Sequence, residues 1–549
     1  MEQSKRDEEL AKDLVRRYET LKGDRSTLEG VWQEIAERVI PAYADKFFGN
    51  GLGKQTEGEQ NTEKMFDSTA AVALTRFSAA MESMLTPRSQ RWHRLKTDNP
   101  FLWKQKEVRL WFEEATRRLF DFRYSAGANY ASQQHEVYNC LGAFGTGAMY
   151  IDRLDAGGLR YKAMHVGELF FLENHQGVVD TAFRVFTMTA RQAAQKWPLD
   201  GLPEKIQQAV EKDQDETFDF LHVVMPRADV DPTKADYRGM DFASYYVALA
   251  GKTLLAESGY RSFPYAISRY TTAPGEIYGR SPAMLALPAI KTLNEEKKTL
   301  LKQGHRTVDP VLLTHDDGVL DGFSLRPGAI NPGGVSMDGR PLVHALPVGN
   351  LAVGKDMMDD ERLVINDAFL VTLFQILVDT PQMTATEVLE RAREKGALLS
   401  PTMGRQQSEF LGPMIARELD VLMRQNLLPP MPGVLIEARG EYKIEYDSPL
   451  SRAQRAEEAA GISRLMQVAV EVAANTQNPE PLDHFNWDVI IPEMADIQGV
   501  PERWMRSMDE VQAIRQGRNQ AAATQQLIAA APGAAALVKA GAVAGEKMQ

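Results

Sequence analysis

The N-terminal part of the chain carries a series of amphipathic helix patterns. "STLEGVWQEIAERVIP" offers Ser26 and Glu29 as a capping box, and Pro41 ends the pattern. Its apolar face consists of Val31, Trp32, Ile35, Ala36 and Val39. "FDSTAAVALTRFSAAMESMLTP" repeats the pattern with Asp67 or Ser68 as the cap and a stripe of Ala73, Phe77, Ala80, Met81 and Met84. This part is therefore predicted to be mostly helical.

From Thr146 onward the period of the pattern changes to that of strands. Gly, Pro and Asp turns separate short apolar runs at residues 148–152, 182–187, 218–225, 245–250 and 265–270. Because helical patterns return later in the chain, we expect an α+β fold that is mostly helical.

The middle of the chain predicts two long helices around a turn-rich segment. Ser281 is a candidate N-cap and Pro282 suits the first helical position of a helix that runs to about Gln303. Pro288 should kink this helix or reset its start. The next forty residues are dense in Gly, Pro and Asp-Gly turns, with strand-like residues 311–313 and 342–344 that predict short hairpins. A second helix then follows, which predicts a helical hairpin with a β module at its tip.

A polar stretch, "DTPQMTATEVLERAREKG" at 379–396, interrupts the second long helix. Asp379-Thr380-Pro381 breaks it, and Thr384 with Glu387 forms a capping box that restarts it. The break therefore indicates a loop whose position is specified locally. Further helices are predicted at 408–427 and from Ala453, separated by the strand-like "YKIEYDSPL". For the Ala-rich end two alternatives remain, a packed helix or a disordered tail.

Composition adds size and compartment to this pattern. At 549 residues, with 44% hydrophobic and 25% charged residues, the chain exceeds one typical core. Cys140 is the lone cysteine, which excludes an intrachain disulfide and fits assembly in a reducing cytoplasm. We find no signal segment and no apolar run of 18 residues, so neither signal-directed secretion nor a membrane span is expected.

The net charge of -12 argues against a protein that clamps phosphates with a basic surface. It does not exclude a protein along which a DNA duplex slides without being tightly bound.

Motifs for catalysis are weak throughout the sequence. "GNGLGKQ" at 49–55 lacks the first Gly and the final Ser or Thr of a phosphate loop, so a glycine linker is the better interpretation. "HDDG" at 315–318 is explained by a hairpin turn. Cys140 on a helix fits a buried small hydrophobe. We predict no catalytic residue, no metal and no cofactor.

Six segments in order resemble the head-tail connector (portal) proteins of short-tailed (podovirus, T7-like) bacteriophages. They are "WQEIAERVIP", "FDSTAAVALTRFSAAMESMLTPRSQRWHRL", "LGAFGTGAMYI", "YGRSPAMLALPAIKTLNEEKK", "TATEVLER" and "YDSPLSRAQR", within residues 10–470. The resemblance implies a ring, usually of twelve subunits, at one capsid vertex. Such a ring is a conduit for genome packaging and ejection and a docking platform for terminase and tail. The Ala-rich end after residue 510 departs from the family.

The resemblance also divides the chain into parts. It implies a wing at 1–280, a first stem helix at 281–306, a clip at 307–350, a second stem helix at 351–377, a tunnel loop at 378–383, a return to the wing at 384–470, and a crown with the Ala-rich tail at 471–549.

Two sets of residues follow as candidates for the DNA channel. The implied tunnel loop consists of Val378, Asp379, Thr380, Pro381, Gln382 and Met383. Its alternative is an ordinary turn between helices. A helical wheel places Lys291, Lys298, Lys302 and His305 on one stripe. The lysines are either channel-facing contacts for passing phosphates or a solvated face stabilised by pairs such as Glu295 with Lys298.

The partners implied by the resemblance are further copies of the chain, double-stranded DNA without sequence specificity, the terminase large subunit, a tail adaptor, and capsid and scaffolding proteins. The location would be the head-tail junction of the virion, after assembly in the host cytoplasm, with no membrane. Two alternatives stay open at this point: a tail hub or internal virion protein, and a metal-dependent nuclease or hydrolase.

Overall fold

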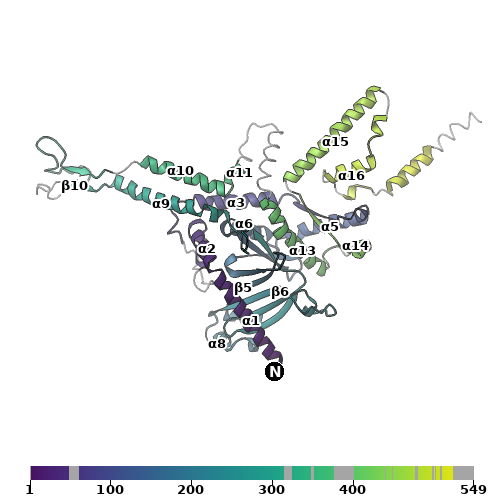
Figure 1. Ribbon diagram of the computed structural model, residues 1–549, viewed down its shortest axis with the longest axis horizontal. Coiled ribbons are helices and arrows are strands. Elements are labelled where there is room, and N and C mark those ends of the chain that lie inside the picture. Colours follow the sequence, from purple (N-terminus) through teal and green to yellow (C-terminus); the bar gives the residue numbers. More distant parts are fainter. Residues whose placement is uncertain are drawn as a thin grey trace, which may run out of the picture. The chain divides into compact units, whose positions relative to one another are not determined.

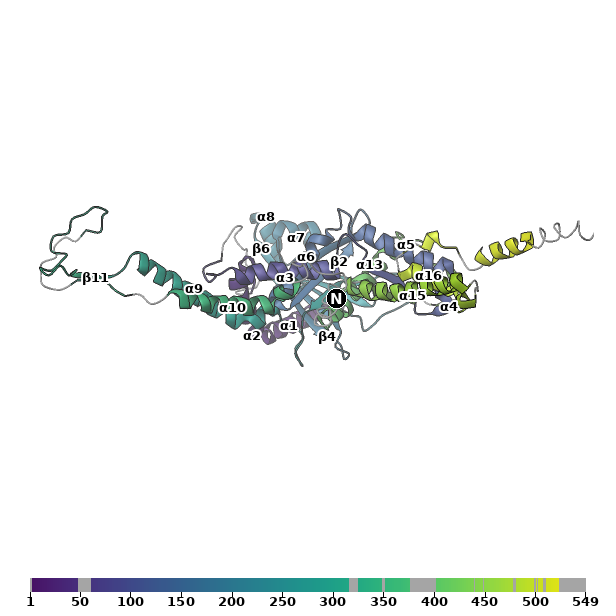
Figure 2. The same ribbon diagram turned by 90° about the horizontal axis from the view of Figure 1, so that it is seen from above.

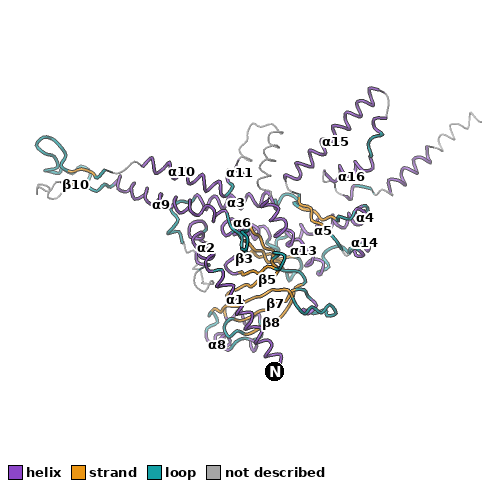
Figure 3. The backbone as a smooth tube through the Cα atoms, viewed as in Figure 1, coloured by secondary structure: helices purple, strands orange, loops and turns teal. Residues whose placement is uncertain are grey.

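The computed structural model describes most of the chain (Figures 1 and 3). The described residues are 2–47, 61–314, 324–347, 351–375, 401–438, 440–447, 449–476, 480–497, 500, 502–506 and 510–522. Their contacts divide the chain into two compact units, which are taken separately below: Met1–Gln90 with Asp121–Leu427, and Arg91–Phe120 with Leu428–Gln549. Helices and antiparallel sheets occur together, which confirms the predicted α+β class.

Two antiparallel sheets form the centre of the first unit. The larger is a meander in the order β4 (Leu169–Glu173), β5 (Val179–Thr189), β6 (Thr217–Pro226), β7 (Phe242–Ala248) and β8 (Thr253–Tyr260). The smaller has the order β3 (Leu159–Met164), β2 (Thr146–Arg153) and β9 (Tyr265–Arg269). All five predicted strand runs are confirmed as β2, β5, β6, β7 and β9, whereas β3, β4 and β8 were not predicted.

Helices cover both faces of the larger sheet. Because side chains alternate along a strand, Leu221 and Phe220 of β6 serve opposite faces. On one face, α1 (Glu2–Asp24) packs Leu14 and its neighbours against Leu221 and Val223. On the other, α7 (Ala190–Lys196) and α8 (Glu204–Lys212) enclose Phe220. In Figure 1, α1 runs diagonally across this sheet.

The helix α2 (Ser26–Val39) buries Trp32, Ile35, Ala36 and Val39 as predicted. The capping box at Ser26 is wrong, since Arg25 holds the cap position in helical backbone geometry and no side chain caps the helix. Arg25 is buried, donates to the Gly167 carbonyl at 2.9 Å and binds the Glu29 carboxylate at 2.7 Å. Glu29 therefore neutralises a buried cation, which a local capping pattern does not reveal.

The helix α6 (Tyr130–Phe144) packs against the smaller sheet, and α3 (Thr69–Leu85) packs against α6. Phe77 and Met81 of the predicted α3 stripe are buried. Ser68 occupies the N-cap position without a side-chain hydrogen bond, and Asp67 accepts instead from the Thr69 amide at 2.9 Å. Cys140 of α6 is buried, as expected of a small hydrophobe.

Two long helices, α9 (Pro282–Val308) and α10 (Leu351–Ala368), run side by side and extend from the packed part of the first unit (Figures 1 and 2). The predicted second helix is shorter than expected. It is interrupted at Phe369 and Leu370, where Leu370 has a φ of 58°, before the short α11 (Val371–Gln375). Phe369 is fully buried, and its ring lies 6.4 Å from that of Phe77.

The first unit closes with a π-helical turn, η5 (Gln406–Leu411), and α13 (Gly412–Arg424). Pro413 lies in the first turn of α13, where its missing amide costs no helical hydrogen bond. In this segment, which the sequence predicts as a helix, Leu411, Ile415, Leu419 and Leu422 are buried, whereas Met423 is exposed.

The second unit joins distant parts of the sequence. Its strands β1 (His93–Lys96) and β12 (Lys443–Tyr446) pair antiparallel, with His93 opposite Tyr446. Its helices are α4 (Pro100–Trp103), α5 (Lys106–Arg123) up to Phe120, α14 (Gly433–Glu437), α15 (Pro449–Thr476) and α16 (Trp487–Ile497). Within the described segments, every helix is too short or too polar to cross a membrane.

Candidate functional site

The start of α9 is fixed by its own sequence. Ser281 accepts a hydrogen bond from the Met284 amide at 2.9 Å and donates to the Ala143 carbonyl at 2.8 Å. The predicted cap and first-turn Pro282 are confirmed, and the helix continues past Pro288 to Val308. The cap therefore also attaches the helix to the end of α6.

The buried face of α9 is an apolar stripe. It consists of Ala286, Ala289, Ile290 and Leu293, none more than 9% exposed. Because these residues recur every three or four positions, they form one face that packs inward and leave the opposite face open.

A polar cluster anchors the hairpin to the start of α3. The buried Asn294 accepts from the amides of Phe66 at 2.7 Å and Asp67 at 3.0 Å, and donates to the Ile290 carbonyl at 2.7 Å. Arg362 of α10 binds the Asp67 carboxylate at 2.7 Å. Burial alone would raise the pKa of Asp67, but hydrogen bonds from Thr69 and Arg362 outweigh it and lower the pKa. Both long helices are thus attached to one point.

The predicted lysine stripe lies on one side of α9 with unequal surroundings. Lys291 Nζ lies 2.5 Å from Glu34 Oε2 of α2. Lys298 Nζ lies 3.6 Å from Glu295 Oε1 and 5.5 Å from the centre of the Phe66 ring. Lys302 is exposed, and no carboxylate of the described chain forms an ion pair with it.

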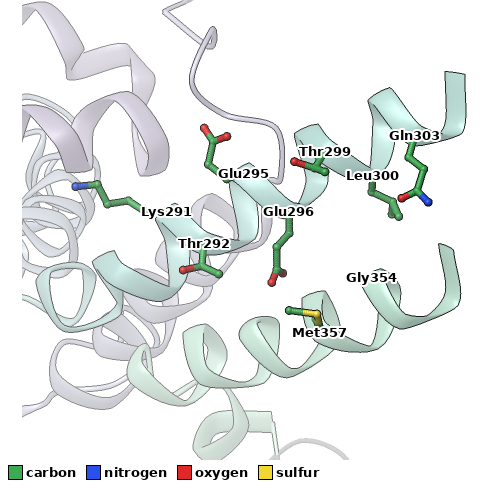
Figure 4. A pocket seen from close by; sticks show the side chains of 9 residues that line it. All are labelled: Lys291, Thr292, Glu295, Glu296, Thr299, Leu300, Gln303, Gly354 and Met357. Atoms are coloured by element: carbon green, nitrogen blue, oxygen red, sulfur yellow. The ribbon is translucent and has the colours of Figure 1, made fainter. Parts of the chain in front are cut away.

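One side of the hairpin holds an acidic groove, shown in Figure 4, with a volume of about 620 Å³. It is lined by Lys291, Thr292, Glu295, Glu296, Thr299, Leu300, Gln303, Gly354 and Met357. The Glu296 side chain points toward α10 near Met357. Its Oε2 atom is buried without a hydrogen-bond partner among the described atoms. Burial and the nearby Glu361 raise the pKa of Glu296.

A second, basic groove of about 630 Å³ also runs along the two helices. It is lined by Lys297, Leu300, Leu301, Gly304, His305, Val308, Lys355, Met358 and Arg362. A Cβ atom on Gly354 would lie 3.2 Å from Leu300, so Gly354 permits the close approach of the helices between the two grooves.

The tip of the hairpin carries the predicted β module in a different form. β10 (Leu312–Thr314) and β11 (Val343–Ala345) pair with each other, Leu312 opposite Ala345. The sequence predicts short hairpins for these two runs, whereas the structure pairs them with each other. Apolar side chains of this segment are exposed, with Ile330 at 90%. Exposed apolar clusters of this kind mark protein contact surfaces.

Several predicted features lie outside the described residues. They are the candidate tunnel loop Val378–Met383, the capping box of Thr384 and Glu387, and the segments at 49–55 and 315–318. The lysines of α9 are therefore the candidate channel residues whose surroundings can be described.

His222 of β6 is a buried titratable group whose ring is fixed by hydrogen bonds. Burial, together with Arg184 and Lys196, lowers the pKa of His222 to about 3. Its ring is hydrogen-bonded to Ser244 at 2.9 Å and Tyr265 at 3.2 Å. The described residues contain no cluster of His, Cys, Asp and Glu that could hold a metal.

Projecting helices with exposed apolar residues and two open grooves are typical of a subunit that assembles with other proteins. Residues 11–505 match the family described as bacteriophage head to tail connecting protein, and the chain belongs to that family. It is 28% identical over 531 residues to the portal protein of Salmonella phage epsilon15, covering 95% of this chain and 93% of that one. It is 31% identical over 540 residues to the probable portal protein of Bordetella phage BPP-1, covering 96% and 95%.

Among solved structures, a chain from the virion of a native gene transfer agent particle is similar at a TM-score of 0.34 and 11% identity. The likeness covers 75% of this chain and 91% of that chain, and it is too weak to support an argument.

These relationships confirm the predicted resemblance and identify the chain as a phage portal protein, which is a structural protein and not an enzyme. They disfavour the nuclease or hydrolase and the tail hub or internal virion protein.

Proposed function

We propose that about twelve copies of the chain form a closed ring at one capsid vertex, at the head-tail junction of the virion. The ring would be the conduit for DNA entry and exit and would bind the terminase large subunit, the tail adaptor, capsid and scaffolding proteins. Assembly would take place in the host cytoplasm. The family match across residues 11–505, which includes both long helices, carries this proposal.

Within this proposal, α9 and α10 are the stem, and the segment around β10 and β11 is the clip. The first unit apart from this hairpin corresponds to the wing, and the C-terminal helices to the crown. The exposed apolar side chains around β10 and β11 support a docking role for the clip.

The channel would be lined by the tunnel loop Val378–Met383 and by Lys291, Lys298 and Lys302. A subunit with a net charge of -12 would let a duplex slide, because few phosphates could be neutralised at once. Of the three lysines, Lys302 is the best placed for transient phosphate contacts, since Lys291 and Lys298 already face Glu34 and Glu295.

Location in the particle tests the proposal. A peptide tag at the C-terminus, labelled with gold and imaged on intact particles, should give a single labelled site per particle at the head-tail junction. A control tag on the major capsid protein should label the whole shell. Label along the tail or inside the head would contradict the proposal and favour a hub or internal protein.

The tunnel loop has its own test. Deleting Thr380–Gln382 should leave ring formation intact and reduce the yield of DNA-filled heads. Rings with unchanged DNA packaging would return this segment to an ordinary turn.

A further inference from the structure

The two grooves of the α9 and α10 hairpin differ in charge. Glu295 and Glu296 line the acidic groove, and Glu361 lies close enough to raise the pKa of Glu296. Lys291, the single cation among its lining residues, is already paired with Glu34. The basic groove is lined by Lys297, Lys355, Arg362 and His305, with no carboxylate among its lining residues. The hairpin therefore has an acidic side and a basic side.

The grooves lie on opposite sides of the helix pair. They share Leu300, which faces α10, and otherwise have different linings. Residues five positions apart, such as Glu296 and Leu301, are separated by roughly 140° around a helix. A neighbour that approaches one groove consequently leaves the other accessible.

Each side also carries exposed apolar residues. Val353, Met357 and Val364 recur at helical spacing on the acidic side of α10, each more than half exposed. Leu301 and Val308 line the basic groove, with Val308 87% exposed. Apolar surface beside unpaired charge is typical of an interface whose partner supplies the opposite charge.

We propose that the acidic groove of one copy binds the basic side of the hairpin in the next copy, with Glu296 and Glu361 facing Lys297 and Lys355 of that copy. The apolar side chains of the two sides would pack around these contacts. This inference rests on the proposed ring, because it assigns the two different surfaces that ring closure requires.

The unsatisfied groups support a second copy as the occupant. Glu296 lines the acidic groove and forms no ion pair with any described Lys or Arg. Lys297 and Lys355 form no ion pair with any described carboxylate. Two acidic sides would repel each other, so the charges disfavour a two-fold dimer in which like sides meet. They favour head-to-tail contacts, in which the acidic side of one copy meets the basic side of the next.

Charge reversal tests the contact in the full-length protein. Glu296→Lys with Glu361→Lys makes both sides basic, and Lys297→Glu with Lys355→Glu makes both acidic. Each pair should abolish rings at concentrations about tenfold above those at which the wild type assembles, because like charges would face each other. All four substitutions together restore complementarity and should restore rings. Asp356→Lys, on α10 but in neither groove lining, is the matched control and should assemble normally.

Mass photometry gives the assembly state, and circular dichroism confirms folding of each variant. A second measurement needs no variant. Rings mixed from ¹⁴N-labelled and ¹⁵N-labelled wild type are treated with a carbodiimide, which joins carboxylates to amines in contact. We expect mixed-isotope crosslinks between Glu296 or Glu361 and Lys297 or Lys355.

The outcomes separate the two claims. Absence of wild-type rings would contradict the proposed function. Wild-type rings with unimpaired two-substitution variants, or folded four-substitution variants that fail to assemble, would overturn the inference alone. Mixed-isotope crosslinks of these lysines only to other carboxylates would overturn it as well.

Discussion

At the scale of single residues, the body of the first unit depends on a fully buried ion pair. Arg123 Nε donates to Glu418 Oε1 at 3.0 Å, and the Tyr161 hydroxyl donates to the same oxygen at 2.6 Å. Both charged side chains are fully buried. Removing one partner would leave the other charge uncompensated in a low-dielectric interior. The pair therefore makes the position intolerant of change on either side.

Glu418→Gln should lower the free energy of unfolding by about 3–5 kcal/mol, because Arg123 would keep its charge without a counter-ion. Urea unfolding followed by circular dichroism measures this loss. Arg424→Ala, which removes an exposed partner of Asp420, is the control and should cost less than about 1 kcal/mol. Equal losses in the two variants would contradict the importance of burial.

Asp67 gives a prediction for acid. Its pKa in the folded protein is lowered from 3.8, so its ionised form contributes stability that is fully present above pH 3.8 and is lost as pH falls through the folded pKa. Asp67→Asn should therefore be less stable than wild type at neutral pH, and the difference should shrink below pH 3.8. Thermal unfolding from pH 3 to 7 measures it. A stability difference between the variant and the wild type that does not change with pH would show that the Asp67 charge does not contribute.

At the scale of elements, the sequence predicts features that depend on neighbouring residues and misses those that depend on distant contacts. Ser281 and Pro282 start α9 as expected because the cap is complete within four residues. The predicted capping box at Ser26 is wrong because the Glu29 carboxylate binds the buried Arg25 side chain instead of the backbone. The break in the second long helix at Leu370 was not predicted, because the neighbouring Phe369 is buried against Phe77, about 290 residues away in sequence.

The strands and the candidate site likewise contain features that the sequence predicts and features that it misses. β8 was missed since every residue in it is half-buried, which leaves no alternation to detect. The pairing of β1 with β12 spans distant sequence and has no local signal. The lysine stripe of α9 was predictable from helical spacing, but the pairing of Lys291 with Glu34 was not. The two grooves were missed because they need both helices at once.

The stem helix α9 yields a prediction for DNA movement. Replacing Lys291, Lys298 and Lys302 together by Gln should change the rate of packaging and its salt dependence while rings still form. Lys302→Gln alone should reproduce most of the change, because the other two lysines face carboxylates. Packaging rates measured across salt concentrations test both statements. Unchanged rates in the triple variant would make the stripe a solvated face.

At the scale of the whole molecule, charge and architecture describe a subunit made for assembly. A net charge of -12 disfavours tight binding of DNA, and the hairpin places acidic and basic grooves on two different sides. A rotation that brings such different sides together and closes generates a ring. Family membership over residues 11–505 agrees with this conclusion.

The most direct test of the ring is the mass of the purified assembly, by native mass spectrometry at several protein and salt concentrations. We predict one dominant species at about twelve times the chain mass of 61.3 kDa, with a central channel in negative-stain images of the same sample. Monomers or dimers alone under every condition would contradict the account.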